Sequence, residues 1–484
     1  MNSPASTCRL DPIPTSLLKN CIDVLLPTIT KIVNLSLSNG HFPDSLKCAH
    51  ITPLFKKGKI QNYLRNNKLL GEKQSAYRAH HSTETALLRV YNDLLLTADK
   101  GEEAILVLLD YSAAFDTINH DIFFQRLQNR YGVSGNALCW FKSYFTNRSQ
   151  AVVVNDCISN VHKPVGGVPQ GSVMGPLSFT MYTSPVEDII KAHGMSGMLY
   201  ADDTQVYAIK SGCDHGATLA KLGACISDIR SWSAANDMKL NDDKTELIHI
   251  SSKFRTAAPI PSLKIGTTHV EPVNNARNLG VTFDKNLDMN QHINNICRSA
   301  SSALHKIGKI RRCLDQQTAE TLVHAFVSSR VDNCNSLLYG LPDQQVNKLQ
   351  RIQNSAARLI TRTKRSEHIT PILRDLHWLS VKQRINFKIL LLTFKCIHGL
   401  APVYLQNLIR DYTPRCCLRS SSKSLLVTPP VCTKSYGSRS FQFSSAVLWN
   451  DLSIKVKEAQ SVTSFKSLLK THLFSVCSFL SFSA

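Results

Sequence analysis

An almost uninterrupted apolar run constrains the fold of this chain most. Residues 104–109 read Ala-Ile-Leu-Val-Leu-Leu, and Asp110 follows them directly. Such a run is typical of a strand covered on both faces, because a strand with one wet face alternates apolar and polar residues. The run therefore predicts a central strand that presents a carboxylate at its C-terminal end, where ligands commonly bind to a sheet.

Two further segments carry the residue types of a catalytic site. Residues 197–208 have two apolar arms around Ala-Asp-Asp-Thr, which predicts a hairpin with Asp202 and Asp203 at its tip. Between Asp110 and this hairpin, a loop rich in Gly and Pro at 164–176 contains Gly-Val-Pro-Gln-Gly-Ser and precedes one predicted helix over 177–190. An isolated Asp pair usually reflects turn chemistry. The order and spacing of all three segments argue against coincidence.

Carboxylates at the ends of two neighbouring strands suit two-metal nucleotidyl transfer. That reaction needs divalent ions about 3.5–4 Å apart, one at the attacking 3′-hydroxyl and one at the leaving group. Mg²⁺ prefers one or two protein carboxylates, completed by water and phosphate oxygens. Asp116 could instead cap the following helix, so we do not include it in the predicted metal site.

The remaining periodicity predicts an α/β centre followed by a helical C-terminal half. The expected helices are 13–39, 61–70, 81–95, 121–131, 137–145, 217–234, 293–310, 317–331, 344–359, 381–398 and 464–474. The expected strands are 49–55, 150–155, 262–265, 268–273 and 278–283. His377-Trp378-Leu379 and residues 446–450 are interpreted as core elements without a catalytic role.

Composition points to a polyanionic partner inside the cell. The chain has 56 Lys and Arg against 35 Asp and Glu, a formal net charge of +21, which favours nucleic acid over an anionic membrane. Its 15 cysteines include no CxxC pair, so neither a zinc knuckle nor a redox motif is predicted. No signal peptide or membrane span is recognised, and we expect an intracellular, soluble protein without resolving nucleus from cytoplasm.

Four segments carry a resemblance to a known family. LLDYSAAFDTINH, GVPQGSVMGPLSF, YADD and LNDDKTE resemble motifs A, B, C and D of the reverse transcriptases of LINE-type (non-LTR) retrotransposons. NLGVTFDKNL resembles the palm-to-thumb segment of the same family, and the match extends from about residue 13 to at least 380. The resemblance implies an RNA-directed DNA polymerase that uses two Mg²⁺ ions, with Mn²⁺ as a substitute. RNA template, DNA primer and dNTPs would be its partners.

The resemblance assigns roles to individual residues. Asp110, Asp202 and Asp203 would hold the metal ions, with Asp203 the more auxiliary of the adjacent pair. Phe115 would crowd the 2′ position of an incoming nucleotide and so select deoxyribonucleotides, since the 2′-hydroxyl distinguishes RNA. An ordinary core aromatic is the alternative for Phe115. Lys244 would neutralise or protonate the leaving pyrophosphate, and a plain surface lysine is its alternative.

The resemblance also implies a set of residues that bind the nucleotide. Gln170, Gly171 and Ser172 match the loop that lies against nucleotide and template, where glycine permits close approach and glutamine offers donors and an acceptor. Arg78 is a candidate phosphate contact, which Lys56 and Lys57 might support. A template–primer channel could be lined by basic residues of the helical half, each of which could equally be a solvated surface charge. They are Lys306, Lys309, Arg311, Arg312, Arg358, Arg362, Lys364 and Arg365.

The sequence also departs from the family pattern. We expect a truncated copy that lacks the preceding endonuclease domain. By comparison with the family pattern, we expect that a few dozen fingers residues are deleted after Gly58, among them an arginine that would grip the triphosphate. That loss would cost a hundredfold or more in rate. Besides an active polymerase, the sequence therefore leaves open a catalytically inactive nucleic-acid-binding remnant and an unstable relic.

The expected fold is α+β, a right-hand polymerase with an antiparallel palm sheet and a helical C-terminal half. Residues 1–60 would form the linker and the start of the fingers, and 61–290 the reverse transcriptase domain with the remaining fingers and the palm. Residues 291–400 would form a helical thumb-like region, and 401–484 a segment of unknown role. Host, target site, oligomeric state and present activity are not predicted.

Overall fold

The computed structural model describes residues 56–480, except 156, 170, 173, 211–214, 256–257, 267 and 414–423, together with a few positions between 27 and 40. The strand expected over 49–55 lies outside these residues, as does most of the helix expected over 13–39. The sections below concern the described part of the chain.

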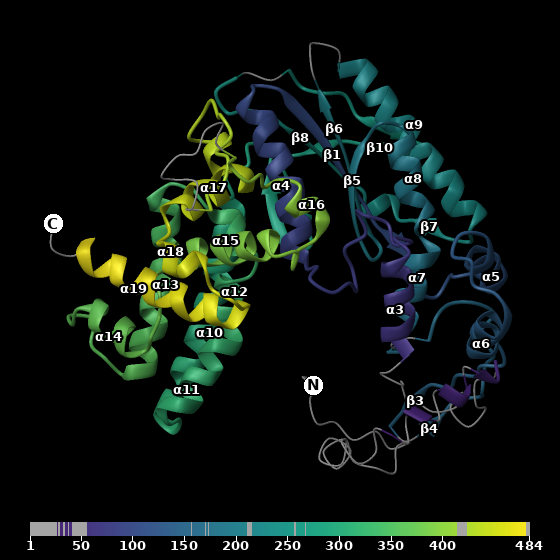
Figure 1. Ribbon diagram of the computed structural model, residues 1–484, viewed down its shortest axis with the longest axis horizontal. Helices are drawn as coiled ribbons and strands as arrows, with labels where there is room; N and C mark the ends of the chain where they lie inside the picture. Colours follow the sequence, from purple (N-terminus) through teal and green to yellow (C-terminus); the bar gives the residue numbers. More distant parts are fainter. Residues whose placement is uncertain are drawn as a thin grey trace.

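A five-stranded sheet in the order β11-β8-β1-β6-β5 forms the centre of the molecule (Figure 1). Its neighbours pair antiparallel, except that β11 runs parallel to β8. The strands are β1 (Glu103–Leu109), β5 (Ser196–Tyr200), β6 (Asp203–Lys210), β8 (Glu246–Ile250) and β11 (Pro272–Val273). Four two-stranded ribbons accompany it: β2 (Tyr111–Ser112) with β7 (Lys239–Leu240), β3 (Val153–Val154) with β4 (Cys157–Ile158), β9 (Leu263–Ile265) with β10 (Thr268–Val270), and β12 (Asn275–Asn278) with β13 (Val281–Asp284).

The central strand is buried on both faces, as its apolar run predicts. Ala104, Leu106 and Leu108 enter one hydrophobic core. Residues 105, 107 and 109 enter the other core, on the opposite face. Since each fully buried Leu, Ile or Val contributes roughly 1.5–3 kcal/mol, this strand fixes the two layers that surround it.

Helices cover the two faces of the sheet separately (Figure 1). One face packs against α5 (His120–Asn129), α6 (Gly135–Phe145), α7 (Met174–Tyr182), α8 (Pro185–Ala192) and α9 (His215–Ala235), with α3 (Lys56–Asn66) beside α7. The other face packs against α4 (Thr83–Asp99) and the C-terminal helices. The helix expected over 81–95 is α4, which begins at Thr83 because Ser82 and Thr85 form a reciprocal capping box.

Several sequence predictions need correction in detail. The strand expected over 268–273 is two strands, because β10 pairs with β9 whereas β11 pairs with β8 of the central sheet. The single helix expected over 177–190 is two helices, because Pro185 cannot donate a backbone hydrogen bond and starts α8 instead. The strand expected over 278–283 is a hairpin that turns at Leu279 and Gly280, both with positive φ. The helix expected over 317–331 contains a π-helical turn at 324–328.

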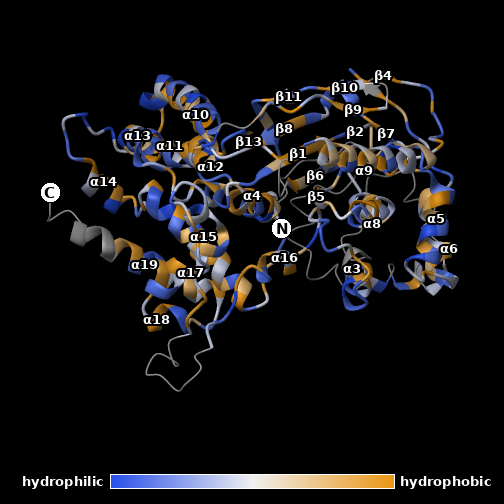
Figure 2. Cartoon of the chain, turned by 90° about the horizontal axis from the view of Figure 1, so that it is seen from above, coloured by the Kyte–Doolittle hydropathy of each residue, from blue (hydrophilic) through white to orange (hydrophobic). Residues whose placement is uncertain are grey.

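The C-terminal half is a helical assembly, whose helices carry both hydrophobic and hydrophilic residues along their length (Figure 2). Its main helices are α10 (Asn290–Ile310), α11 (Gln316–Val323), α12 (Ser329–Val331), α13 (Asp343–Thr361), α14 (Ile369–Asp375), α15 (Val381–Ile397), α16 (Val403–Gln406), α17 (Phe441–Asp451), α18 (Ile454–Lys457) and α19 (Val462–Leu480). The predicted α+β class with an antiparallel-rich sheet and a helical C-terminal half is thus confirmed. Among the described residues, no helix is long and apolar enough to span a membrane.

The segment after residue 400 packs against the palm-side helix α4. Tyr404, Tyr436 and Phe441 belong to the same hydrophobic core as α4 and β1. The last residue of α4, Asp99, accepts hydrogen bonds from the backbone N–H groups of Cys432 (2.8 Å), Thr433 (2.7 Å) and Gly437 (3.1 Å). The C-terminal segment is therefore integrated with the sheet rather than appended to it.

Candidate active site

The sheet register brings the ends of the two predicted motifs together. β1 pairs with β6 so that Leu109 lies opposite Thr204, and the hairpin of β5 and β6 closes with Tyr200 opposite Asp203. Asp110, one residue beyond Leu109, therefore lies beside Asp202 and Asp203 at the hairpin tip. This places the three predicted carboxylates at one edge of the palm sheet.

Desolvation and the charges of neighbouring carboxylates raise the pKa values of Asp202 and Asp203. The pKa of Asp203 is raised to about 6, mainly by desolvation and further by the charges of Asp202 and Asp110. The residue as a whole is nevertheless exposed to solvent. Burial, followed by the charge of Asp110, likewise raises the pKa of Asp202. Several carboxylates thus share one small region of the sheet, an arrangement typical of cation sites.

Lys244 contacts this cluster directly. Its Nζ lies 3.0 Å from Asp110 Oδ2, and the hydrogen bond to Asp110 is the main reason that the pKa of Lys244 is raised. A backbone contact explains the placement, because the Asn241 N–H donates to the Asp110 carbonyl oxygen (2.8 Å). The ribbon of β2 and β7 holds the two segments in register.

The tip of the hairpin is held by a residue that sequence reasoning missed. Ala201 has φ of +57°, a left-handed conformation that a non-glycine residue adopts only when its surroundings enforce it. Gln74, 6% exposed, accepts a hydrogen bond from the Ala201 N–H (3.1 Å) and directs its Nε2 at the Ala201 carbonyl (3.4 Å). The positive φ appears only in the structure, so no signal in the sequence pointed to Gln74.

The segment around Gln74 extends the sheet. The Leu199 N–H donates to the Lys73 carbonyl (3.0 Å), and the Ser75 N–H donates to the Leu199 carbonyl (2.8 Å). The Ser75 hydroxyl in turn lies 2.7 Å from the Tyr404 hydroxyl on α16. A continuous set of contacts therefore runs from the C-terminal segment to the turn at Ala201.

Phe115 lies in the turn after Asp110, partly buried, and stacks on Phe179 with ring centroids 4.5 Å apart. Its carbonyl accepts a hydrogen bond from the Val168 N–H (2.8 Å), which ties the first motif to the Gly- and Pro-rich loop. Asp116 does not cap α5, because that cap is the Asn119 side chain. Phe115 is thus fixed beside Asp110 while part of its ring remains accessible.

The nucleotide-loop residues are described in part. Gln170 lies outside the described residues. Gly171 is exposed with φ of +76°, a conformation that glycine adopts without strain. The Ser172 hydroxyl accepts a hydrogen bond from the Gly175 N–H (3.0 Å) and so supports the first turn of α7.

Arg78 is engaged within its own loop. Its Nη1 donates to the carbonyls of Gly71 and Gln74, the latter at 2.9 Å. These contacts shape the loop that carries Gln74. A phosphate contact by Arg78 would therefore use its other N–H groups.

Part of the predicted basic cluster serves packing. Arg311 donates to the carbonyls of Leu359 (2.8 Å) and Ile360 (2.6 Å), which joins the ends of α10 and α13. Arg358 donates to the Glu367 carbonyl (3.1 Å), and Arg362 to the Arg311 carbonyl (3.2 Å). The exposed members of the cluster are Lys306, Lys309, Arg312, Arg362, Lys364 and Arg365.

A family comparison agrees with this geometry. Residues 56–283 match the model of the family "Reverse transcriptase (RNA-dependent DNA polymerase)". The matched range contains every strand of the central sheet and all of Asp110, Asp202, Asp203 and Lys244. Residues 56–283 are therefore similar to a reverse transcriptase domain. Members of this family generally use divalent metal ions.

Curated relatives of this chain are polymerases of mobile elements. The chain is 29% identical over 325 residues to the probable RNA-directed DNA polymerase from transposon X-element of Drosophila melanogaster, covering 65% of this chain and 34% of that protein. It is 25% identical over 321 residues to the RNA-directed DNA polymerase from mobile element jockey of Drosophila funebris, covering 59% and 34%. The chain thus spans about a third of the length of these relatives.

Solved structures of telomerase overlap the chain more loosely. The structure of apo telomerase from Candida tropicalis superposes with a TM-score of 0.37 and 12% identity, covering 68% of this chain and 54% of that one. The telomerase of Candida albicans in complex with a fragment of telomeric RNA gives a TM-score of 0.36 and 11% identity, covering 66% and 56%.

Proposed function

We propose that this chain is an RNA-directed DNA polymerase that adds dNTPs to the 3′-hydroxyl of a DNA primer paired with an RNA template. Two Mg²⁺ ions, replaceable by Mn²⁺, would be bound by Asp110, Asp202 and Asp203. The convergence of these carboxylates at the strand ends of a reverse transcriptase domain supports the proposal most strongly.

The donor set suits the proposed ions. All three side chains offer the carboxylate oxygens that Mg²⁺ prefers. Burial and neighbouring carboxylates raise the pKa values of Asp202 and Asp203, and a cation bound beside them would favour their charged forms. Bound there, the ions would activate the primer hydroxyl and neutralise the triphosphate.

Other residues of the chain would orient the reactants. Lys244, exposed beside Asp110, would provide a proton or a positive charge for the leaving pyrophosphate. Phe115, held by Phe179, would exclude a nucleotide that carries a 2′-hydroxyl. Gln170, Gly171 and Ser172 would contact nucleotide and template, and Arg78 a phosphate. The exposed lysines and arginines beyond residue 300, with the net charge of +21, would bind the nucleic-acid backbone.

A primer-extension assay on a primed RNA tests the proposal. We expect dNTP incorporation that requires template, primer and Mg²⁺ or Mn²⁺. Phe115→Val should raise ribonucleotide incorporation relative to deoxyribonucleotide incorporation. Phe254→Ala, which alters an aromatic side chain that is 65% exposed, should leave that ratio unchanged. RNA binding without incorporation in either metal would overturn the proposal and indicate an inactive nucleic-acid-binding remnant.

A further inference from the structure

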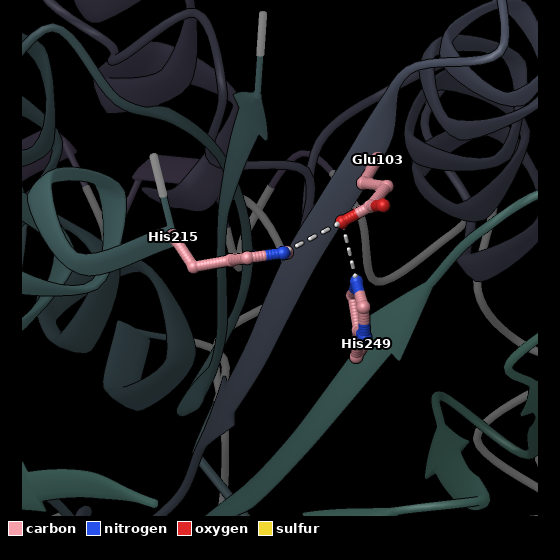
Figure 3. Close-up of side chains that lie close together, drawn as sticks. All are labelled: Glu103, His215 and His249. Atoms are coloured by element: carbon pink, nitrogen blue, oxygen red, sulfur yellow. Dashed lines mark hydrogen bonds and ion pairs between the residues drawn. The ribbon is translucent and has the colours of Figure 1, made fainter. Parts of the chain in front are cut away.

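Three potential metal ligands meet at the end of the sheet that is remote from the catalytic carboxylates (Figure 3). Glu103 begins β1, His249 lies on β8, and His215 is the first residue of α9. Glu103 and Asp110 are seven residues apart, and a strand rises about 3.3 Å per residue, so the two ends are separated by roughly 23 Å. The cluster is therefore distinct from the proposed polymerase centre.

The sheet register explains why the three side chains converge. His249 lies opposite Ile105, two residues beyond Glu103, so both side chains project from the same face of the sheet. That face is the one covered by α9, whose Leu219 shares a core with Ile105. The start of α9 then brings His215 over the pair, as Figure 3 shows.

The distances suit a shared ion. Glu103 Oε2 lies 3.0 Å from His249 Nε2 and 3.6 Å from His215 Nε2, and the three atoms lie within 4.8 Å of one another. In a tetrahedral zinc site, bonds of 2.0–2.1 Å place neighbouring donor atoms about 3.3 Å apart. Small side-chain rotations would therefore complete the geometry.

The chemistry of the donors selects the ion. Two imidazole nitrogens and one carboxylate oxygen form a set used by zinc enzymes, whereas Mg²⁺ and Ca²⁺ prefer oxygen alone. The side chains of Glu103, His215 and His249 are 22%, 20% and 13% exposed, so the site is sheltered but reachable by water. A surface hollow lined by His249, Lys253 and Lys285 borders it.

We propose that Glu103, His215 and His249 bind one Zn²⁺ ion through Glu103 Oε2 and the two Nε2 atoms, with water as the fourth ligand. The ion would join the start of α9 to the sheet and stabilise the palm, because it binds the folded chain preferentially. Among the residues that the structure describes, the buried His215 Nδ1 has no hydrogen-bond partner. Since ligating histidines usually donate from their second nitrogen, we expect weaker affinity than in a fully supported zinc site, by about 10–100-fold.

The test uses the full chain, stripped of metal with a chelator and dialysed against Zn²⁺ alone. Because cysteines can bind zinc nonspecifically, the accessible thiols of the folded chain are first blocked, and each variant is compared with wild type in the same state. Wild type should retain one more ion per chain than His215→Ala or His249→Gln. Its melting temperature should rise with Zn²⁺, and the variants should lose that rise. His269→Ala, which removes an exposed histidine of β10, should behave as wild type.

Two independent ligand variants protect the test against misfolding. Each variant is accepted for the comparison only if it melts cooperatively without metal. Co²⁺ provides a second readout, because a tetrahedral site with nitrogen ligands gives it an intense visible absorption that either substitution should abolish. Equal zinc content and equal melting shifts in wild type and both folded variants would overturn the proposal. The cluster would then be a metal-free hydrogen-bonded group.

Discussion

Lys244 Nζ lies 3.0 Å from Asp110 Oδ2, so a cation of the chain itself occupies one side of the proposed metal site. Lys244 is exposed, with 67% of its side chain accessible to solvent. An exposed ion pair of this kind is worth little to stability, and its lysine can move away at little cost. The contact therefore fits a group that exchanges partners during nucleotide addition.

Lys244→Ala should lower kcat by about 10²-fold or more, the usual contribution of a positioned acid. The same change should lower the Mg²⁺ concentration required for half-maximal incorporation, because Lys244 no longer competes for Asp110. Steady-state primer extension across a Mg²⁺ series measures both quantities. Lys264→Ala, an exposed lysine of β9, is the matched control. An unchanged kcat in Lys244→Ala would show that Lys244 is a surface lysine without a role in the reaction.

Gln74→Ala should disturb the catalytic turn while leaving the carboxylates in the chain. The Ala201 N–H would lose its acceptor, which costs about 1–3 kcal/mol in a buried setting. We expect a lower urea midpoint and a larger proportional loss of incorporation. Gln128→Ala on the exposed face of α5 should change neither. Full activity in Gln74→Ala would show that the turn keeps its conformation without this residue.

Asp99→Asn should loosen the contact between α4 and the C-terminal segment. Burial raises the pKa of Asp99, but hydrogen bonds from Cys432, Thr433 and Gly437 outweigh it and leave the pKa below its usual value. Because hydrogen bonds to a charged group contribute about 1.5–3 kcal/mol, the free energy of unfolding should fall by that order. Urea unfolding measures it, and Asp451→Asn at the exposed end of α17 is the control.

Gly437→Ala should destabilise the same contact by a different route. An added Cβ would come within 2.5 Å of the Asp99 carboxylate. We expect a lower urea midpoint, like that of Asp99→Asn, and little further loss when both changes are combined. Fully additive losses would show that the two positions act independently.

Stability should fall as the pH drops from 6.5 toward 4, in part because of His292. Burial lowers the pKa of His292 to about 4, whereas its unfolded value is near 6.5. The unfolded chain takes up the proton first, so the contribution is complete above pH 6.5 and is lost below it, at up to about 1.4 kcal/mol per pH unit. Urea midpoints across this range should vary less in His292→Gln than in wild type. His269→Gln is the exposed control, and identical pH profiles would contradict the assignment.

Local patterns predicted the elements that carry the site. The apolar run before Asp110 indicated a doubly covered strand because each of its residues enters one of two cores. The apolar arms around Asp202 and Asp203 indicated the hairpin that the register confirms. Both signals are local, so they could be recognised from the sequence alone.

Contacts between distant segments were not predictable in this way. Gln74 reaches Ala201, and Asp99 reaches Thr433, across more than a hundred intervening residues. Arg78 has the chemistry of a phosphate ligand, yet it donates to carbonyls of its own loop, because nearby backbone acceptors compete for its guanidinium. Such partners depend on how the layers pack.

Asp202→Asn in primer extension tests the central claim most directly. We predict that wild type extends a DNA primer on an RNA template and that Asp202→Asn reduces the rate by at least about a hundredfold. Asp228→Asn, which alters an α9 side chain that is 62% exposed, should extend the primer at the wild-type rate. Equal extension rates in wild type and a folded Asp202→Asn protein would contradict the assignment of this carboxylate cluster as the polymerase centre.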